Sequence, residues 1–247
     1  TWMLVVAKSS RKPVTLSKLS TTPKSPADID RLDVAKQHVA SMVRPMIEKV
    51  LFDLGNVLLR FDFDRAYKAM AEHGAHVPKL KGESMDALKI EYETGAISNE
   101  EMYQRTAVLS GYHGSQEHFE QSWEDIFEEN APMVDFLRNL QTRGIPRYLL
   151  PNSNDLHVRH VETAYAVLEP FNDIIFSHQA KAMKPDEMIF EKAIAQFGLE
   201  PSKTAYIDDL ADNIATGRRL GFQCIHYNPD AHDVAKNELR ALGLITT

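Results

Sequence analysis

The feature that most constrains the fold is an alternation between short apolar segments and longer segments with helical periodicity, beginning at Ile47. The short segments are rich in β-branched and aromatic residues, as strands are. The sequence predicts strands at residues 47–53, 145–151, 173–177, 204–208 and 222–227. Strands that alternate with helices form parallel sheets covered on both faces, so we expect an α/β fold with a Rossmann-like three-layer core.

One region interrupts this alternation, because no convincing strand is found from about Asp64 to Asn130. Helical patterns in this region occupy residues 64–74, 84–95, 98–111 and 115–130. We therefore expect an all-helical cap at residues 64–130, inserted into a core made of residues 47–63 and 131–247.

Capping residues support the helical interpretation of the insert. Asp64, Ser98 and Ser115 each stand at the start of a helical pattern and are favourable N-cap residues. Ser98 and Glu101 also have the spacing of a capping box.

The N-terminal segment 1–46 differs in composition from the rest of the chain. It is rich in Ser, Thr, Lys and Pro, and no acidic residue precedes Asp28. This composition is typical of a disordered leader and also of an organellar transit segment, and the lack of a strong amphipathic arginine face favours the leader. We expect a disordered extension on a cytoplasmic protein.

Charge and hydropathy exclude two classes of partner. The formal net charge is -7 and the pI about 5.8, so no global basic field is present to attract nucleic acid or an anionic membrane. No apolar run approaches the roughly 20 residues of a membrane span. A small anionic substrate stays compatible with this charge, because a local site can be positive. The single cysteine, Cys224, lies in an apolar run and is expected to be a small buried hydrophobe.

Polar residues follow three of the predicted strands. Asp53 ends the first, the segment 151–154 (PNSN) follows the second, and Asp208 and Asp209 end the fourth. Each is by itself a common turn or cap residue. Ligands of open parallel sheets bind beyond the carboxyl ends of the strands, so the three together indicate a site at this edge.

Four motifs occur in a fixed order: VLFDLGNVLL, YLLPNSN, MKPDEMIF and YIDDLADNIATGRRLG, with ETGAISNEE between the first and the second. They resemble the motifs of the haloacid dehalogenase-like hydrolase superfamily, and the resemblance covers residues 47–228. The DLGNV form most resembles the branch of sugar-phosphate phosphatases similar to alpha-glucose-1-phosphate phosphatase. The resemblance implies a Mg²⁺-dependent phosphatase that acts on a small phosphorylated metabolite such as a sugar phosphate.

The resemblance also implies roles for individual residues. Asp53 would be the nucleophile that forms an aspartyl-phosphate. Lys184 would hold the phosphate and offset the charge of Asp53, although by itself it would be taken for an exposed lysine before a helix-opening proline. Asn152 and Ser153 would bind the phosphate.

The implied metal ligands are carboxylate and carbonyl oxygens, which Mg²⁺ prefers. They are Asp53, the backbone carbonyl of Gly55, Asp208 and Asp209, with Asp209 bound directly and Asp208 either directly or through water. Asp212 lies one turn further along, where it either supports the ligands or only favours the N-terminus of the next helix. Both interpretations of Asp212 stay open.

Two residues depart from the family pattern. Position 55, where the family usually has an aspartate for general acid-base catalysis, is a glycine, and such catalysis is worth roughly 10² to 10⁴-fold. Pro151 replaces a usual Ser or Thr and lacks both a hydroxyl and an N–H, which costs about 1.5–3 kcal/mol in one charged hydrogen bond. Asn152 can still donate its N–H, and we expect Ser153 to compensate in part.

These departures leave two alternatives to the phosphatase. The first is a regulatory or phosphate-binding relative that keeps the fold and metal site while Gly55 and Pro151 have removed most of the rate. The second is a 2-haloacid dehalogenase, which needs no acid because halide leaves unprotonated. Dehalogenases do without Mg²⁺, so the Asp208 and Asp209 pair argues against that activity.

Overall fold

The computed structural model describes residues 46–245 of the protein. The predicted disordered extension, apart from its last residue, lies outside the described residues. The strands are β1 (Lys49–Phe52), β2 (Leu59–Phe61), β3 (Phe127–Glu129), β4 (Arg147–Leu149), β5 (Asp173–Ile174), β6 (Thr204–Asp208) and β7 (Gln223–His226). The α-helices are α2 (Phe63–Ala71), α3 (Val77–Leu80), α4 (Glu83–Glu93), α5 (Asn99–Ser110), α6 (Gln116–Glu124), α7 (Ala131–Thr142), α8 (Asp155–Ala164), α9 (Ser177–Ala180), α10 (Glu187–Phe197), α11 (Ala211–Arg219) and α12 (His232–Ala241).

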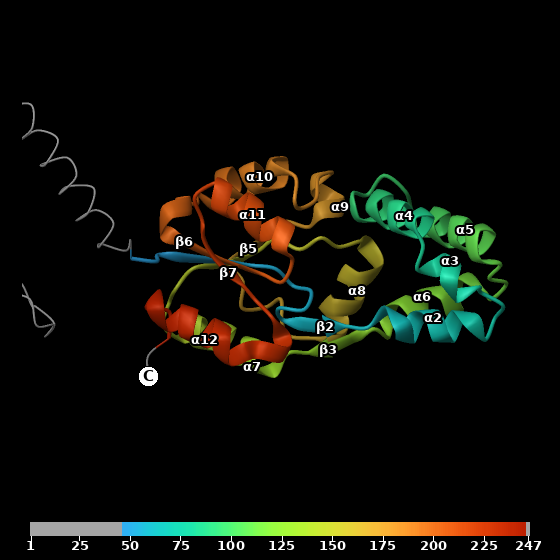
Figure 1. Ribbon diagram of the computed structural model, residues 1–247, viewed down its shortest axis with the longest axis horizontal. Helices are drawn as coiled ribbons and strands as arrows, with labels where there is room; N and C mark the ends of the chain where they lie inside the picture. The colour runs from blue at the N-terminus through green and yellow to red at the C-terminus, as the bar shows by residue number, and fades with distance from the viewer. Residues whose placement is uncertain (1–45, 246–247) are drawn as a thin grey trace, which may run out of the picture. The chain divides into compact units, whose positions relative to one another are not determined.

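The core is a parallel sheet with the strand order β5-β4-β1-β6-β7, so β1 is the central strand (Figure 1). In its register Leu51 lies opposite Tyr148 on one side and Tyr206 on the other. Because all pairs in this sheet are parallel, every strand presents its carboxyl end at the same edge. The predicted α/β core is confirmed.

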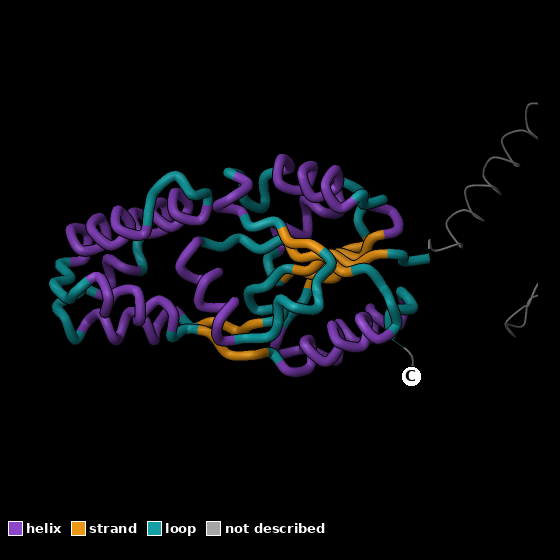
Figure 2. Tube along the Cα trace, turned by 180° about the vertical axis from the view of Figure 1, so that it is seen from behind, coloured by secondary structure: helices purple, strands orange, loops and turns teal. Residues whose placement is uncertain are grey.

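Side chains of β1 alternate between two hydrophobic clusters, as a strand buried on both faces requires. Val50 and Phe52 join the cluster that includes α7 and α12, and Leu51 joins the cluster that includes α10 and α11. The helices accordingly lie on opposite faces of the sheet (Figures 1 and 2). Cys224 packs against the second cluster, and burial raises the pKa of its thiol to about 12, which leaves it a poor nucleophile.

Helix ends near the site follow from the local sequence. Asn154 precedes α8 and its side chain accepts a hydrogen bond from the N–H of His157. Asp186 caps α10 in the same way, and Gly198 ends that helix in the left-handed region at φ 59°. Both N-caps set the direction in which a helix leaves the edge that holds the carboxyl ends of the strands.

The helices α2–α6 form a separate region with its own apolar cluster, which we call the helical region (Figure 1). Met70, Met85 and Trp123 are fully buried members of that cluster. As predicted, Ser98 forms a capping box with Glu101, and Ser115 caps α6. No helix in residues 46–245 is both long enough and apolar enough to span a membrane.

The structure corrects two predictions at the boundary of the helical region. A strand, β3, lies inside the stretch where none was expected, and it pairs antiparallel with β2. Its sequence, FEE, has little strand character, and the pairing with β2 stabilises it instead. The N-cap of α2 is Asp62 and not Asp64, because the Asp62 carboxylate accepts a hydrogen bond from the N–H of Asp64.

Candidate active site

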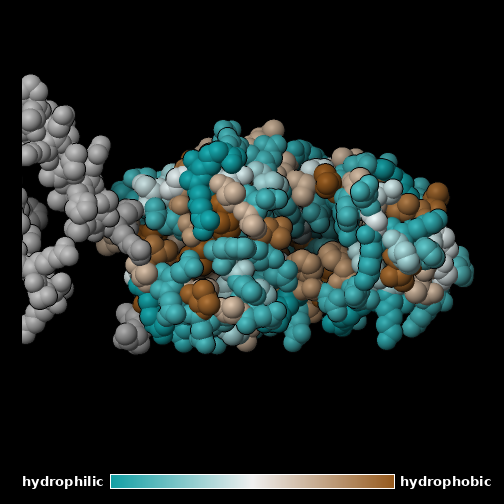
Figure 3. Space-filling model, in the orientation of Figure 1, coloured by the Kyte–Doolittle hydropathy of each residue, from teal (hydrophilic) through white to brown (hydrophobic). Residues whose placement is uncertain are grey.

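A cavity of about 460 Å³ lies at the carboxyl ends of β1, β4 and β6. Asp53 directly follows β1, Asn152 comes shortly after β4, and Asp209 directly follows β6, and all three line the cavity. The helical region contributes Glu93. The surface is hollowed between the core and the helical region (Figure 3). The predicted convergence of the three strand ends is therefore seen in the fold.

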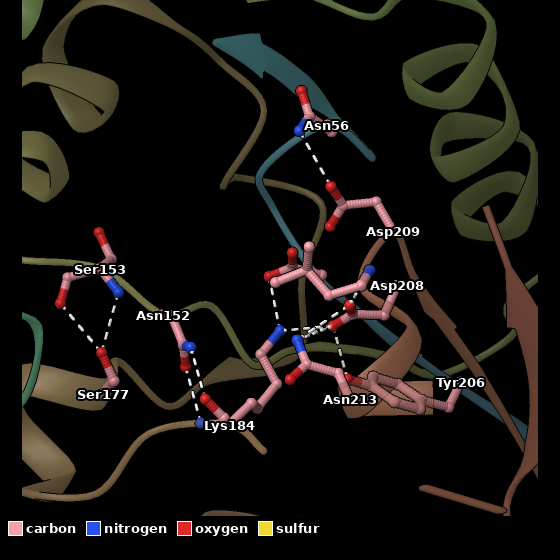
Figure 4. Close-up of polar contacts among 11 residues, drawn as sticks. Asn56, Asn152, Ser153, Ser177, Lys184, Tyr206, Asp208, Asp209 and Asn213 are labelled. Carbon is pink, nitrogen blue, oxygen red and sulfur yellow. Dashed lines mark hydrogen bonds and ion pairs between the residues drawn. The ribbon is translucent and has the colours of Figure 1, made fainter. Parts of the chain in front are cut away.

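Lys184 lies at the centre of the site. Its Nζ is 2.7 Å from Oδ1 of Asp53 and 2.7 Å from Oδ2 of Asp208, and its side chain is 1% exposed. The exposed lysine considered as an alternative is therefore ruled out. Asn152 holds the backbone of Lys184 with two hydrogen bonds, donating to its carbonyl at 2.8 Å and accepting from its N–H at 2.9 Å (Figure 4).

Burial and mutual attraction set the charges of this group. Burial raises the pKa of Asp53 to about 7, with Lys184 opposing the shift and Asp208 adding to it. Burial acts to lower the pKa of Lys184, but the Asp208 and Asp53 carboxylates outweigh it, so the pKa is raised and the ammonium stays charged. The pKa of Asp208 is lowered, because Lys184 and further hydrogen bonds outweigh its burial.

Asp208 is fully buried and both of its oxygens are occupied. Oδ2 accepts from Lys184 at 2.7 Å and from the Tyr206 hydroxyl at 2.5 Å, and Oδ1 accepts from the Leu210 N–H at 2.9 Å (Figure 4). The Asn213 amide lies within 3.2 Å of both oxygens. This set of donors makes Asp208 an anchor for Lys184.

The three aspartates fit a divalent cation. Oxygens of Asp53, Asp208 and Asp209 lie within 4.8 Å of one another. Three carboxylates face one ammonium, so the group has an excess of negative charge that a cation would neutralise. Asp209 accepts a hydrogen bond from Asn56 at 2.9 Å, which orients it toward the group (Figure 4). Among the described residues the carbonyl of Gly55 accepts no hydrogen bond, as a metal ligand requires.

Backbone N–H groups are available for an anion. Those of Leu54, Gly55 and Asn152 donate to no other residue in the described part of the chain, and all three residues line the cavity. Unpaired N–H groups at such an edge can bind phosphate oxygens. The side chain of Asn152 is committed to Lys184, so only its backbone is free for this role.

Ser153 and Asp212 both line the cavity, and their predicted roles stay predictions. Ser153 is buried, and its N–H donates to Oγ of Ser177 at 2.9 Å. Asp212 is exposed in the first turn of α11 and, within residues 46–245, forms no hydrogen bond with the other aspartates. The contact with Asp208 comes from the neighbouring Asn213 instead.

Aromatic side chains form part of the wall of the cavity, which we call the aromatic wall: Phe61, Phe63, Phe127 and His157. Phe61 and Phe63 pack edge to face at 5.4 Å, and Phe127 packs the same way on His157 at 5.0 Å. Burial lowers the pKa of His157 to about 3, so its ring is neutral. None of these four residues belongs to the predicted site. Phe61 and Phe127 reach the cavity through the pairing of β2 with β3, which the sequence does not predict.

Comparison with known proteins agrees with this geometry. The family model for haloacid dehalogenase-like hydrolases matches residues 47–221. A curated relative, the D-ribitol-5-phosphate phosphatase of Bacteroides thetaiotaomicron, is 28% identical over 187 residues, which are 72% of this chain and 90% of the relative.

Solved structures show the same fold. A haloacid dehalogenase-family enzyme from Bacteroides thetaiotaomicron, crystallised as a magnesium complex, has a TM-score of 0.67 and 24% identity over 76% of this chain and 98% of that one. A predicted hydrolase of the same type from Porphyromonas gingivalis has a TM-score of 0.66 and 25% identity over 78% and 98% of the two chains. Since the family model covers well over half of the sequence, the chain belongs to the haloacid dehalogenase-like hydrolases.

Proposed function

We propose that the protein is a magnesium-dependent phosphatase that hydrolyses a small phosphate monoester through an aspartyl-phosphate on Asp53. The observation that carries this proposal is Lys184, buried between Asp53 and Asp208 in a cavity where Asp209 adds a third carboxylate. The excess negative charge calls for a divalent cation. That cation and the Lys184 ammonium would together attract an anionic phosphate ester. The magnesium complex of the similar Bacteroides enzyme supports the choice of metal.

In this proposal Asp53 attacks the phosphorus atom and displaces the alcohol. Lys184 reduces the repulsion between the Asp53 carboxylate and the anionic substrate, and Asn152 fixes the position of Lys184. The backbone N–H groups of Leu54, Gly55 and Asn152 bind the oxygens of the phosphoryl group as charge builds on them.

The metal would be held by Asp53, the carbonyl of Gly55 and Asp209, with Asp208 acting through water because its oxygens are occupied. When bound, Mg²⁺ supplies Lewis acid polarisation of the phosphoryl group and charge neutralisation. The remaining steps belong to side chains of the protein.

The helical region would act as a cap that selects the substrate. It contributes Phe63 of the aromatic wall and Glu93, which would meet the leaving part of the substrate, and a cavity of about 460 Å³ suits a small ester. Aromatic faces pack against the C–H faces of sugars, and the similar Bacteroides protein is named for D-ribitol 5-phosphate. We therefore favour sugar or polyol phosphates as the substrate class.

The experiment is a panel of sugar, polyol and aryl phosphates assayed with Mg²⁺ or with EDTA, using wild type and Asp53→Asn. We expect release of phosphate that requires Mg²⁺ and falls at least about 10³-fold in Asp53→Asn. Activity that ignores both EDTA and the substitution would refute the proposal.

Two other outcomes point to the alternatives. Binding of Mg²⁺ and inorganic phosphate without turnover of any ester would identify a regulatory relative, the possibility that Gly55 and Pro151 raise. Release of halide from 2-chloropropionate would identify a dehalogenase.

A further inference from the structure

The proposed reaction lacks a proton donor at position 55, where the family usually has an aspartate. The Phe61 side chain lies against Gly55 at this position. A Cβ built on Gly55 would lie 2.7 Å from Cε1 of Phe61, which is shorter than the van der Waals contact distance between two carbon atoms. The Phe61 ring is supported by Phe63 at 5.4 Å and by the pairing of β2 with β3. Hydrocarbon therefore occupies the space in which a side chain at position 55 would begin, and the donor has to come from another element.

Besides the metal carboxylates and Lys184, three titratable side chains of the described residues line the cavity: Glu93, His157 and Asp212. The Nδ1 of His157 lies 3.1 Å from the Asn154 amide nitrogen, and burial holds its pKa at about 3. The acidic imidazolium form is therefore absent near neutral pH, and the neutral ring is too weak an acid to protonate a leaving group. Asp212 is exposed in the first turn of α11, three residues after Asp209 in the chain. Glu93 is half-buried, and within residues 46–245 its carboxylate has no hydrogen bond or ion pair.

The backbone around Glu93 is fastened to the core. Oγ of Ser177 lies 2.6 Å from the carbonyl of Glu93 and 3.0 Å from the carbonyl of Ser153, and it accepts the Ser153 N–H. The carbonyl of Gly95, two residues after Glu93, accepts a hydrogen bond from Nζ of Lys181 at 2.7 Å. The end of α4 is thus joined to the segments that follow β4 and α9, and Glu93 is presented to the cavity from a fixed support.

We infer that Glu93 is the general acid-base of the reaction, in place of the aspartate that position 55 lacks. The inference rests on the proposed function. In the first step Asp53 forms the P–O bond, the bond from phosphorus to the leaving oxygen breaks, and the Glu93 carboxyl gives its proton to that oxygen, releasing an alcohol. In the second step the Glu93 carboxylate takes a proton from water, whose oxygen attacks phosphorus. The bond to Asp53 breaks, and the products are inorganic phosphate, free Asp53 and protonated Glu93.

The surroundings of Glu93 suit this exchange. Burial raises the pKa of Glu93 to about 7, while Lys89 from α4 and Lys184 from the core oppose the shift. A group that titrates near neutral pH is present in both protonation states during turnover, as an acid that becomes a base must be. Glu93 also belongs to the helical region, so completion of the site depends on the helical region meeting the core.

The test compares leaving groups of different acidity. Wild type and Glu93→Gln are assayed with Mg²⁺ on D-ribitol 5-phosphate and benzyl phosphate, whose alkoxides must be protonated, and on p-nitrophenyl phosphate, whose phenolate needs no proton. For Glu93→Gln we expect kcat/KM to fall about 10²-fold or more on the alkyl esters and less than about 10-fold on the aryl ester. The aryl ester should show a burst of p-nitrophenolate followed by slow turnover, because activation of water is impaired.

Controls separate catalysis from folding. Glu91→Gln alters a carboxylate on the same helix that pairs with Arg105 at the surface, and it should leave both rates unchanged. Thermal unfolding shows whether Glu93→Gln folds, and Glu93→Asp should recover part of the rate on alkyl esters. Equal losses on all three esters, or no loss, would overturn the role of Glu93 while leaving the phosphatase in place. A wild-type protein that hydrolyses none of these esters and no other ester of the panel would overturn the role together with the proposed function.

Discussion

Gly55 and Phe61 form a complementary pair at the scale of single residues. The glycine leaves its carbonyl free for a metal, and the phenyl ring fills the space beside its Cα. Phe61 is 37% exposed, so part of its ring is held by packing on Phe63 and part faces the cavity or solvent. An acid at position 55 would therefore displace the Phe61 ring from its present position.

This pair predicts the outcome of a direct repair. Gly55→Asp alone should lower the free energy of unfolding by about 1–3 kcal/mol, because its Cβ would overlap the Phe61 ring. Gly55→Asp combined with Phe61→Ala should recover most of that loss relative to Phe61→Ala alone. Urea unfolding of wild type, both single variants and the double variant measures the coupling. Strict additivity of the two substitutions would argue against the overlap.

The carboxylates of the core could be predicted from the sequence, because each lies at the end of a strand in a recognisable motif. Asp53, Asp208 and Asp209 belong to this group, and the structure brings them within 4.8 Å of one another. Glu93 opens the ETGAISNEE segment and Ser177 ends the predicted strand 173–177, but the sequence assigned neither residue a role. In the structure β5 stops at Ile174 and Ser177 begins α9. The position of Glu93 and Ser177 at the site results from packing between segments 84 residues apart in the chain.

At the scale of elements, the junction between α4 and the core depends on one buried hydroxyl. Ser177 is fully buried at the start of α9 and connects the last residue of α4 with the segment after β4. The helical region and the catalytic edge of the sheet therefore share a hydrogen-bonded contact as well as apolar packing.

Removing that hydroxyl should affect stability and turnover together. Ser177→Ala leaves the carbonyls of Glu93 and Ser153 without this donor, so we expect a loss of about 1–3 kcal/mol in the free energy of unfolding. We also expect a lower kcat on alkyl phosphates, because Glu93 loses its support. The matched control is Ser202→Ala, at an exposed serine of the core. If Ser177→Ala matches Ser202→Ala in both stability and kcat, the junction does not position the site.

The five parallel strands were predicted from their apolar, β-branched sequences, and all five are present, although β5 is only Asp173–Ile174. The β2–β3 pair was missed, because its three-residue strands are defined by each other and not by their own composition. The β2–β3 pair places Phe61 and Phe127 in the wall of the cavity. Because the pair was not predicted, this part of the aromatic wall was not predicted either.

At the scale of the whole molecule, the free energy of unfolding should depend on pH because of His157. Its folded pKa is lowered from 6.5 to about 3 by burial, so below about pH 6.5 only the unfolded chain takes up a proton at this position. The stability that this histidine contributes is complete above pH 6.5 and is lost as the pH falls toward 3.

A pH series of unfolding experiments isolates this contribution. Between about pH 7 and about pH 4.5 the free energy of unfolding of wild type should fall by about 2.5 kcal/mol more than that of His157→Gln. The loss of ring packing in the variant adds a difference that does not depend on pH. The exposed His113, changed in the same way, serves as the control. A wild type and a His157→Gln variant whose difference does not change with pH would contradict the assignment of a neutral buried ring.

The central claim is that Asp53 is phosphorylated during turnover, and the most direct measurement traps that intermediate. Wild type, mixed with Mg²⁺ and p-nitrophenyl phosphate, is quenched in acid within the first turnover and digested, and the peptides are analysed by mass spectrometry. We predict one phosphoryl group on the peptide that contains Asp53, absent with EDTA and absent in Asp53→Asn. Hydrolysis of the ester with the label on another residue, or with Asp53→Asn as active as wild type, would contradict the account.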